Sequence, residues 1–273
     1  MYLILLLPLL LFAYASNNHI SVSVHQLPLP KRKKHPSTLS VVHISDLHNK
    51  SFGAGQIRLI QQIASLHPDL IAVTGDLVDR APYRHAVIFL KKGSQICLIY
   101  VVRGNHESIA GNFKDLQKEL AGCDIHLLKN NCEDFQKHGY TYRIAGLDDP
   151  AFHGREKKYA PYMKKTLDKM TRRHNHSKAD YQILLSHRPE LFHLYCRYPF
   201  DLVLCGHAHG GQVRPPFTDG LYAPNQGIFP KYTSGAHTKN HTTEIISRGL
   251  GNSSFPLRLF NDPEIVHILL QPQ

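Results

Sequence analysis

The sequence predicts a mixed α/β fold, and two observations support that prediction. Short apolar runs alternate with segments of helical spacing through the first half of the chain, a rhythm typical of a mostly parallel sheet covered by helices. Each strong apolar run also ends in a cluster of Gly, Asp, His or Asn. The length of 273 residues, with 42% hydrophobic and 19% charged residues, is that of an ordinary globular protein and not of a disordered one.

In chain order, the first half contains three expected strands and three expected helices. The strands are apolar, partly β-branched runs at residues 39–44, 70–73 and 95–102. The helices are expected at residues 57–66, 86–92 and 113–121. In the first of these helices Ile57, Ile60 and Ile63 share one face, and glycines end the other two.

The second half is less regular but contains more strand-like runs. These runs lie at residues 140–145, 183–186, 200–204, 244–247 and 265–270. Helices are expected at residues 162–173 and 189–195, the second with Pro189 at its first position. The charged segment 149–180 is read either as a lid over a lipid headgroup or as a solvated insertion. No internal repeat is seen, so residues 39–273 are expected to form one domain.

The amino-terminal residues differ in character from the rest of the chain. Residues 1–15 are apolar throughout and predict a membrane anchor, with a cleaved signal segment as the alternative. Residues 16–38 are expected to be a linker that contains three prolines and the basic run 31–34. A basic run after an inserted segment predicts an inner-membrane protein with its domain on the cytoplasmic face, and an exported protein is the alternative.

Charge and cysteine content narrow the range of partners. Thirty-two basic against 21 acidic residues give a net charge of +11, which favours an anionic partner such as a phosphorylated substrate or an acidic membrane surface. Nucleic acid would also suit this charge, but we see no aromatic-basic platform of the kind that binds single strands. The five cysteines form no CxxC pair, so neither a disulfide framework nor a zinc knuckle is indicated.

The polar clusters at the strand ends carry the functional prediction. Carboxyl ends of strands are where α/β proteins build their sites, so these loops are expected to converge. The clusters are residues 45–48, 74–79, 103–107, 186–189 and 206–209, and each supplies Asp, His or Asn, which are nitrogen and oxygen ligands suited to divalent metals. Any one cluster alone is more often a turn or a helix cap. Five in order, each following a strand, favour a metal site.

The combined motifs resemble those of the calcineurin-like metallophosphoesterase family. The motifs are Asp46-Leu-His48, Gly75-Asp76, Gly104-Asn-His-Glu107, His187 and Gly206-His-Ala-His209. Within that family, Ser186-His-Arg-Pro-Glu190 and Gly206-His-Ala-His-Gly-Gly-Gln212 resemble the YaeI/YkuE-like phosphodiesterase branch. The likeness covers about residues 39–270. It implies a two-sheet β-sandwich flanked by helices, in four αββα layers.

The resemblance also implies two divalent metal ions and a division of ligands between them. One ion would be held by Asp46, His48, Asp76 and His209, and the other by Asp76, Asn105, His187 and His207. A water bridging the ions would attack phosphorus, and His106 matches the family's catalytic histidine. Manganese is the expected metal, with iron or zinc as alternatives.

The expected substrate combines this chemistry with the apolar amino terminus. A phosphodiester or pyrophosphate bond in a membrane lipid precursor fits both, for example UDP-2,3-diacylglucosamine of the lipid A pathway. A nuclease or cyclic-nucleotide phosphodiesterase with the same metals is the alternative enzyme. A metal-binding scaffold tethered to a membrane is the alternative without catalysis. The sequence gives no oligomeric state.

Overall fold

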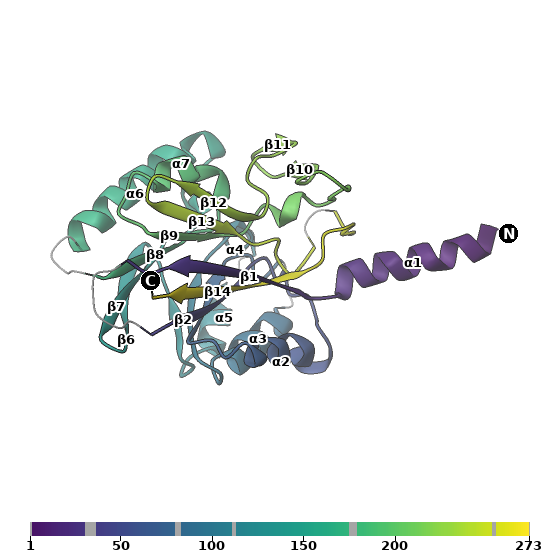
Figure 1. Cartoon of the computed structure of the whole chain (residues 1–273), viewed down its shortest axis with the longest axis horizontal. Helices are drawn as coiled ribbons and strands as arrows, with labels where there is room; N and C mark the ends of the chain where they lie inside the picture. Colours follow the sequence, from purple (N-terminus) through teal and green to yellow (C-terminus); the bar gives the residue numbers. More distant parts are fainter. Residues whose placement is uncertain are drawn as a thin grey trace.

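Two six-stranded sheets packed face to face form the body of the protein in a computed structural model (Figure 1). The structure describes residues 2–30, 37–79, 83–110, 113–174, 179–252 and 255–272. Helices cover the outer sides of both sheets. The predicted α/β class is therefore confirmed, and so is the two-sheet arrangement that the resemblance implies.

The first sheet has the strand order β1-β14-β2-β3-β4-β5. Its strands are β1 (Ser21–Pro28), β14 (Glu264–Gln271), β2 (Leu39–Ile44), β3 (Leu70–Thr74), β4 (Leu98–Val102) and β5 (Ile125–Leu127). The four strands from β2 to β5 are parallel, which brings the loops after β2, β3 and β4 to one edge. Helices α2 (Ile57–Ser65), α3 (Arg84–Gly93), α4 (Asn105–Ile109) and α5 (Phe113–Glu119) belong to this half of the chain.

The second sheet has the order β12-β13-β9-β8-β7-β6. Its strands are β12 (Gly235–Lys239), β13 (Thr242–Ile246), β9 (Leu202–Cys205), β8 (Tyr181–Leu185), β7 (Tyr140–Gly146) and β6 (Asn131–Lys137). Strands β7, β8, β9 and β13 are parallel neighbours, so the loops after β8 and β9 share an edge. Helices α6 (Tyr159–His174) and α7 (Phe192–Tyr195), and the small hairpin of β10 (Tyr222–Ala223) and β11 (Gly227–Ile228), complete this half.

Three apolar layers hold these elements together. The middle layer lies between the sheets and joins residues such as Val41 and Ala72 of the first sheet to Ile144 and Leu204 of the second. A second layer packs α2 and α3 on the first sheet. A third packs α6 and α7 on the second sheet. Burial of both faces explains why the central strands read as continuous apolar runs.

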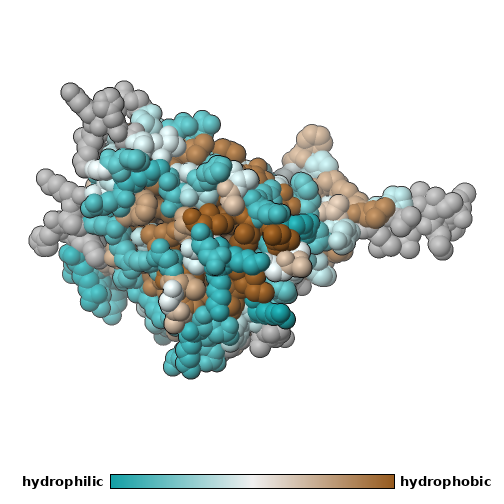
Figure 2. Space-filling model, turned by 90° about the horizontal axis from the view of Figure 1, so that it is seen from below, coloured by the Kyte–Doolittle hydropathy of each residue, from teal (hydrophilic) through white to brown (hydrophobic). Residues whose placement is uncertain are grey.

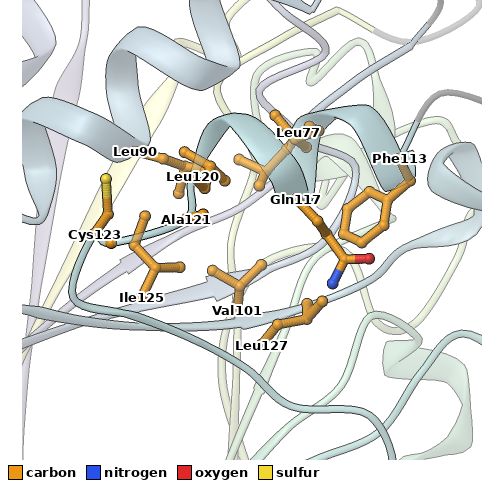
Figure 3. A pocket seen from close by; sticks show the side chains of 12 residues that line it. Leu77, Leu90, Val101, Phe113, Gln117, Leu120, Ala121, Cys123, Ile125 and Leu127 are labelled. Carbon is orange, nitrogen blue, oxygen red and sulfur yellow. The ribbon is translucent and has the colours of Figure 1, made fainter.

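An apolar cavity of about 240 Å³ lies within the second of these layers (Figure 3). Its walls come from α3, β4, α5 and β5, with Leu77 and Leu120 on one side and Val101 and Leu127 on the other. Hydrophobic side chains also gather near the middle of the face that is seen from below (Figure 2). Of the lining residues that the structure describes, Leu77 is the one that belongs to the polar loops, and it follows Asp76 in the chain.

The amino-terminal part departs from the sequence prediction. Helix α1 (Tyr2–Asn18) projects from the body, and residues 21–28, expected in a linker, form β1 along β14. The prolines in and beyond this segment made it resemble a linker. Only the last residue of β1 is a proline, and an edge strand tolerates a proline there. The basic run 31–34 lies outside the described residues. Among the helices that are described, none has both the length and the apolar character needed to cross a bilayer.

Other differences lie in the second half of the chain. Strands β5, β6, β10, β11 and β12 were not expected, because they are short or carry polar residues on exposed faces. Helix α6 buries Met163, Leu167 and Met170 against the second sheet, so it covers a sheet and is not a lid. The apolar residues on one face of α6 pack it on the core. The charged residues on its outer face are the reason that the sequence resembled a solvated insertion.

Candidate metal centre

The seven predicted ligands lie together where the two sheets meet. Asp46 and His48 follow β2, Asp76 follows β3, Asn105 begins α4 after β4, and the histidines follow β8 and β9. Five of the seven have left-handed backbones with φ between 46° and 66°, namely Asp46, His48, Asp76, His207 and His209. Such backbones are costly in residues other than glycine and are concentrated at functional sites. Strain at five positions indicates that these loops are shaped for a purpose other than stability.

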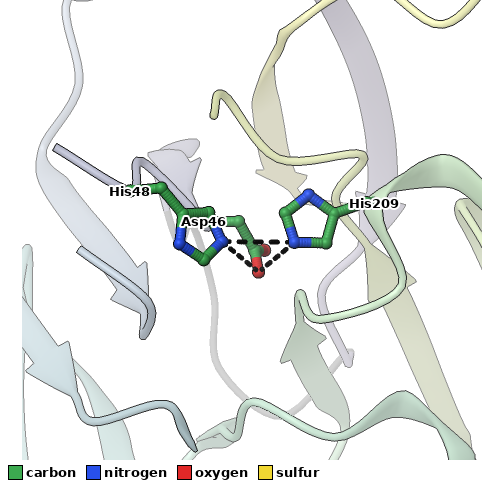
Figure 4. A group of neighbouring side chains, drawn as sticks. All are labelled: Asp46, His48 and His209. Carbon is green, nitrogen blue, oxygen red and sulfur yellow. Dashed lines mark hydrogen bonds and ion pairs between the residues drawn. The ribbon is translucent and has the colours of Figure 1, made fainter. Parts of the chain in front are cut away.

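The first cluster contains Asp46, His48 and His209 (Figure 4). The Nε2 atoms of His48 and His209 face each other at 3.3 Å, and their rings stack. Asp46 Oδ1 lies 3.3 Å from His209 Nε2 and 4.0 Å from His48 Nε2. All three side chains are at most 4% exposed. Two imidazole nitrogens and a carboxylate oxygen therefore surround one point.

The second cluster contains Asp76, His187 and His207, with Asn105 beside them. His187 Nε2 lies 3.2 Å from Asp76 Oδ2 and 3.1 Å from Asn105 Oδ1. The His207 backbone N–H donates to Asp46 Oδ2 at 3.0 Å, which ties this cluster to the first. The sequence prediction that His207 and His209 serve different clusters agrees with this placement.

Asp76 lies between the two clusters. Its Oδ2 is 3.2 Å from His187 Nε2 and 3.8 Å from His48 Nε2, so one carboxylate oxygen faces an imidazole of each cluster. Its other oxygen accepts the backbone N–H of His106 at 2.9 Å. That hydrogen bond fixes the orientation of the carboxylate. The position suits a ligand that two cations share.

Burial sets the protonation of the imidazoles. It lowers the pKa of His48, and it lowers the pKa of His209 and of His207 well below their usual range, with help from neighbouring positive groups. Burial acts in the same direction on His187, but the charge and hydrogen bond of Asp76 raise the pKa of His187 to about 10. The imidazoles of His48, His207 and His209 are therefore neutral, which is the form that binds metals.

A hydrogen bond selects the coordinating nitrogen of His187. Its Nδ1–H donates to the Thr74 carbonyl at 2.7 Å, which leaves Nε2 facing Asp76 and Asn105. A backbone carbonyl on the far nitrogen is a frequent support for a metal-binding histidine. The neutral imidazoles of His48, His207 and His209, the Nε2 atom of His187 once a cation displaces its proton, two buried carboxylates and an amide are a donor set that fits a pair of divalent cations. Within the described residues, the metal-capable clusters contain no cysteine.

His106, the predicted catalytic residue, lies at the rim of this centre. Its ring meets the ring of His48 edge to face, and its side chain is 30% exposed. Nδ1 is 2.9 Å from Asp79 Oδ1, and Nε2 is 3.9 Å from Asp76 Oδ2. Asp79 therefore fixes the ring so that Nε2 faces the centre. The exposure leaves room for a substrate to reach it.

Hydrogen bonds and close backbone approaches hold the loops of the centre together. Glu107 accepts the N–H groups of Gly104 at 2.7 Å, Asp76 at 3.0 Å and Val78 at 3.1 Å. Burial and the charge of Asp76 raise the pKa of Glu107 to about 7. A Cβ on Gly206 would lie 1.8 Å from Ser45 Oγ, and one on Gly104 would lie 2.2 Å from Asp76 Oδ1. Only glycine permits either approach.

Two arginines near the centre have internal partners. Arg103 donates to both oxygens of Asp148 and stacks on Phe152. Arg188 donates from Nε to Asp149 at 2.6 Å and is 3% exposed. Its Nη1 lies 3.2 Å from His207 Nε2. Both guanidinium groups therefore form ion pairs within the loops that surround the centre.

Sequence reasoning did not single out three polar residues at the centre. Asp79 and Glu107 stand inside motifs that were quoted, but nothing in their spacing marks them as supports. Asn225 lies in the turn between β10 and β11, with its Oδ1 2.9 Å from His207 Nε2. No pattern in the sequence links that turn to β9. Only the folded hairpin brings the two together.

Comparisons with known proteins agree with this geometry. A family model described as calcineurin-like phosphoesterase matches residues 39–211. The chain is 29% identical over 238 residues to the uncharacterized metallophosphoesterase YkuE of Bacillus subtilis, covering 85% of this chain and 78% of that protein. It is 26% identical over 270 residues to YkoQ of the same organism, covering 93% of both.

More distant relatives extend the comparison. A zebrafish protein named transmembrane protein with metallophosphoesterase domain is 25% identical over 273 residues, and the match covers 90% of this chain and 56% of that protein. Among solved structures, TT1561 of Thermus thermophilus superposes with a TM-score of 0.51 at 14% identity, covering 78% of this chain and 91% of that one. This last likeness shows the shared fold.

Proposed function

Because the chain belongs to the calcineurin-like phosphoesterase family and is therefore a metal-dependent phosphoester hydrolase, we propose that it cleaves a phosphodiester or pyrophosphate bond in a lipid-linked precursor. The observation that supports the reaction is the placement of Asp76 between two buried clusters of imidazole and carboxylate. We name UDP-2,3-diacylglucosamine as the substrate to test, with a lipid monophosphate and UMP as products.

The ligand assignment follows the two clusters. Asp46, His48 and His209 would hold one ion, Asn105, His187 and His207 would hold the other, and Asp76 would contact both. When bound, such a pair supplies positive charge to the phosphoryl oxygens and activates water for attack on phosphorus. Nitrogen and oxygen donors without sulfur suit manganese, our working choice, as well as iron or zinc.

The chain's own groups would do the remaining work. His106, oriented by Asp79, would transfer a proton to the leaving oxygen or stabilise its developing charge from Nε2. Asn225 and Arg188 flank His207 on the side of the second cluster and would limit how its ring can turn. No side chain is needed as a covalent nucleophile.

The proposed location of the reaction is a membrane surface, with the domain on the cytoplasmic side of an inner membrane. Two observations support it: α1 is apolar and projects from the body, and the zebrafish relative is named a transmembrane protein. A net charge of +11 also favours anionic lipid.

The test is hydrolysis of UDP-2,3-diacylglucosamine by the purified full-length chain with added Mn²⁺, beside bis-p-nitrophenyl phosphate. His106→Asn is the variant of interest, and His138→Asn is its control, because His138 is an exposed histidine in the β6–β7 turn with a left-handed backbone that Asn tolerates. Lipid turnover that falls in His106→Asn alone would support the proposal. Turnover of the soluble diester without the lipid would keep the chemistry and remove the substrate. Metal binding without any turnover would favour a scaffold.

A further inference from the structure

Three exposed phenylalanines have a left-handed backbone conformation, which bulky residues avoid. Phe217, Phe229 and Phe260 have φ values of 69°, 52° and 54°. All three are exposed, Phe217 completely and the others to 72% and 56%. A left-handed backbone is rare in bulky residues because it costs conformational free energy. A side chain that is exposed to water makes no packing contacts that would offset this cost. Repetition at three loop tips indicates that these side chains meet something other than water.

These phenylalanines belong to segments that pack on one another. Leu259 bridges Val213, which places the turn containing Phe217 beside the loop containing Phe260. The Phe260 ring lies 5.1 Å from the Phe12 ring of α1. The other large exposed apolar side chains of these segments are Leu11, Phe12, Tyr14, Tyr222, Ile228, Phe255 and Leu257. We call this set, with the three phenylalanines, the apolar rim.

The apolar rim adjoins the metal centre. Asn225, between Tyr222 and Ile228, reaches His207, and the Asn261 side chain donates to the His209 carbonyl at 2.7 Å. Arg258, buried between Leu257 and Leu259, donates to the Gly251 carbonyl at 3.0 Å. Gly251 in turn donates its N–H to the Asp46 carbonyl. The loops that carry the rim therefore also support the ligands on both sides of the centre.

The chemistry of the rim favours a lipid bilayer over a protein groove. The sequence of residues 2–13 contains no charged or amide residue, whereas a helix that docks in a protein groove keeps a polar face for water. Figure 2 shows hydrophobic side chains where α1 leaves the body. The rim's segments 8–18, 213–233 and 248–262 carry four basic and two acidic residues. Of the basic residues, Lys231 is exposed near Phe229, whereas Arg258 is buried. Aromatic tips beside an exposed lysine suit the boundary between headgroups and acyl chains.

We propose that the apolar rim inserts into the interface of an anionic bilayer and seats the metal centre at the level of the lipid headgroups. The phosphate ester of a lipid would then reach the centre without leaving the membrane. The biological role of this insertion rests on the lipid-directed function proposed above. Binding of the rim to a bilayer, however, is measured separately from hydrolysis.

The experiment is sedimentation of the full-length protein with vesicles of phosphatidylethanolamine and phosphatidylglycerol. The test variant is Phe217→Asn/Phe229→Asn/Phe260→Asn, because Asn tolerates a left-handed backbone and the fold gains no strain. Val24→Thr is the control, an exposed apolar residue on β1 that keeps its β-branched shape. Burial of one phenylalanine is worth roughly tenfold in affinity, so we expect vesicle binding to fall roughly a thousandfold in the triple variant.

The same samples are assayed with bis-p-nitrophenyl phosphate and by thermal melting. We expect the triple variant to keep both its rate on this soluble diester and its melting temperature, and Val24→Thr to bind vesicles as the parent does. Vesicle binding that persists in the triple variant, or a parent that does not bind, overturns the proposal. Rim-dependent binding without lipid hydrolysis supports the rim and rejects the lipid substrate.

Discussion

The two sheets contribute different donor atoms to the centre. Loops after β2, β3 and β4 of the first sheet bring Asp46, Asp76 and Asn105, along with His48. Loops after β8 and β9 of the second sheet bring His187, His207 and His209, all imidazoles. Oxygen donors thus come only from the first sheet, among the seven candidate ligands, and most of the nitrogen donors come from the second.

This difference makes the centre dependent on the packing of the sandwich. Each buried carboxylate needs a compensating group, and here that group comes from the other sheet, as in the pairs Asp76–His187 and Asp46–His209. Each of the two clusters takes its donors from both sheets. The middle apolar layer, which stabilises the fold, is therefore also what positions the donors.

The largest effect is expected from removing the charge that both clusters share. Asp76→Asn keeps the side-chain shape but weakens the hold on both cations, and we expect the rate on bis-p-nitrophenyl phosphate to fall on the order of 10³-fold or more. Asp115→Asn, on the exposed face of α5, is the control. Steady-state kinetics with saturating Mn²⁺ measure the loss. A rate within tenfold of the parent would contradict a shared role for Asp76.

Removing an imidazole of the second sheet should have a smaller effect. His207→Asn changes one cluster and leaves the donors of Asp46, His48 and His209 in place. We expect the rate to fall on the order of 10²-fold and the metal content to drop by about one ion per chain. Elemental analysis after desalting checks the content, with His138→Asn as the control. Loss of both ions would mean that the two clusters do not bind separately.

Removal of the metal ions by chelation tests, without any substitution, how far bound cations between the two sheets stabilise the fold. Cations that bind the folded chain at a hundred times their Kd stabilise it by about 2.7 kcal/mol, which corresponds to a melting shift of roughly 5–10 °C. We expect the metal-free protein to stay folded, because the Asp76–His187 ion pair still joins the sheets. Melting with and without Mn²⁺ measures the shift. In Asp76→Asn the same addition should shift melting far less, and an equal shift would place the stabilising ions elsewhere.

The smallest effect is expected at Asp79, which is hydrogen-bonded to His106 at the rim of the centre. Asp79→Asn should lower kcat about tenfold and leave the metal content unchanged, because the carboxylate orients the ring and lies outside the two proposed ligand sets. His106→Asn should lower kcat by about 10²-fold or more and should make a second change at Asp79 nearly silent. A fully additive double variant would separate the two residues.

The sequence predicted the centre far better than its surroundings, for a physical reason. Strand-end loops are local features, so an apolar run followed by Asp, His or Asn can be read from adjacent residues. Asn225 reaches His207 only because the β10–β11 hairpin folds back, and β1 is completed by pairing with β14 at the other end of the chain. Such contacts depend on the whole fold. The strained phenylalanines gave no signal either, because a backbone angle is not written in residue type.

The most direct test of the central claim is a crystal structure of the Mn²⁺-loaded protein with anomalous scattering data. The account predicts two anomalous peaks where the sheets meet, one beside Asp46, His48 and His209 and one beside Asn105, His187 and His207, with Asp76 in contact with both. A single peak, or two peaks that do not share Asp76, would contradict it.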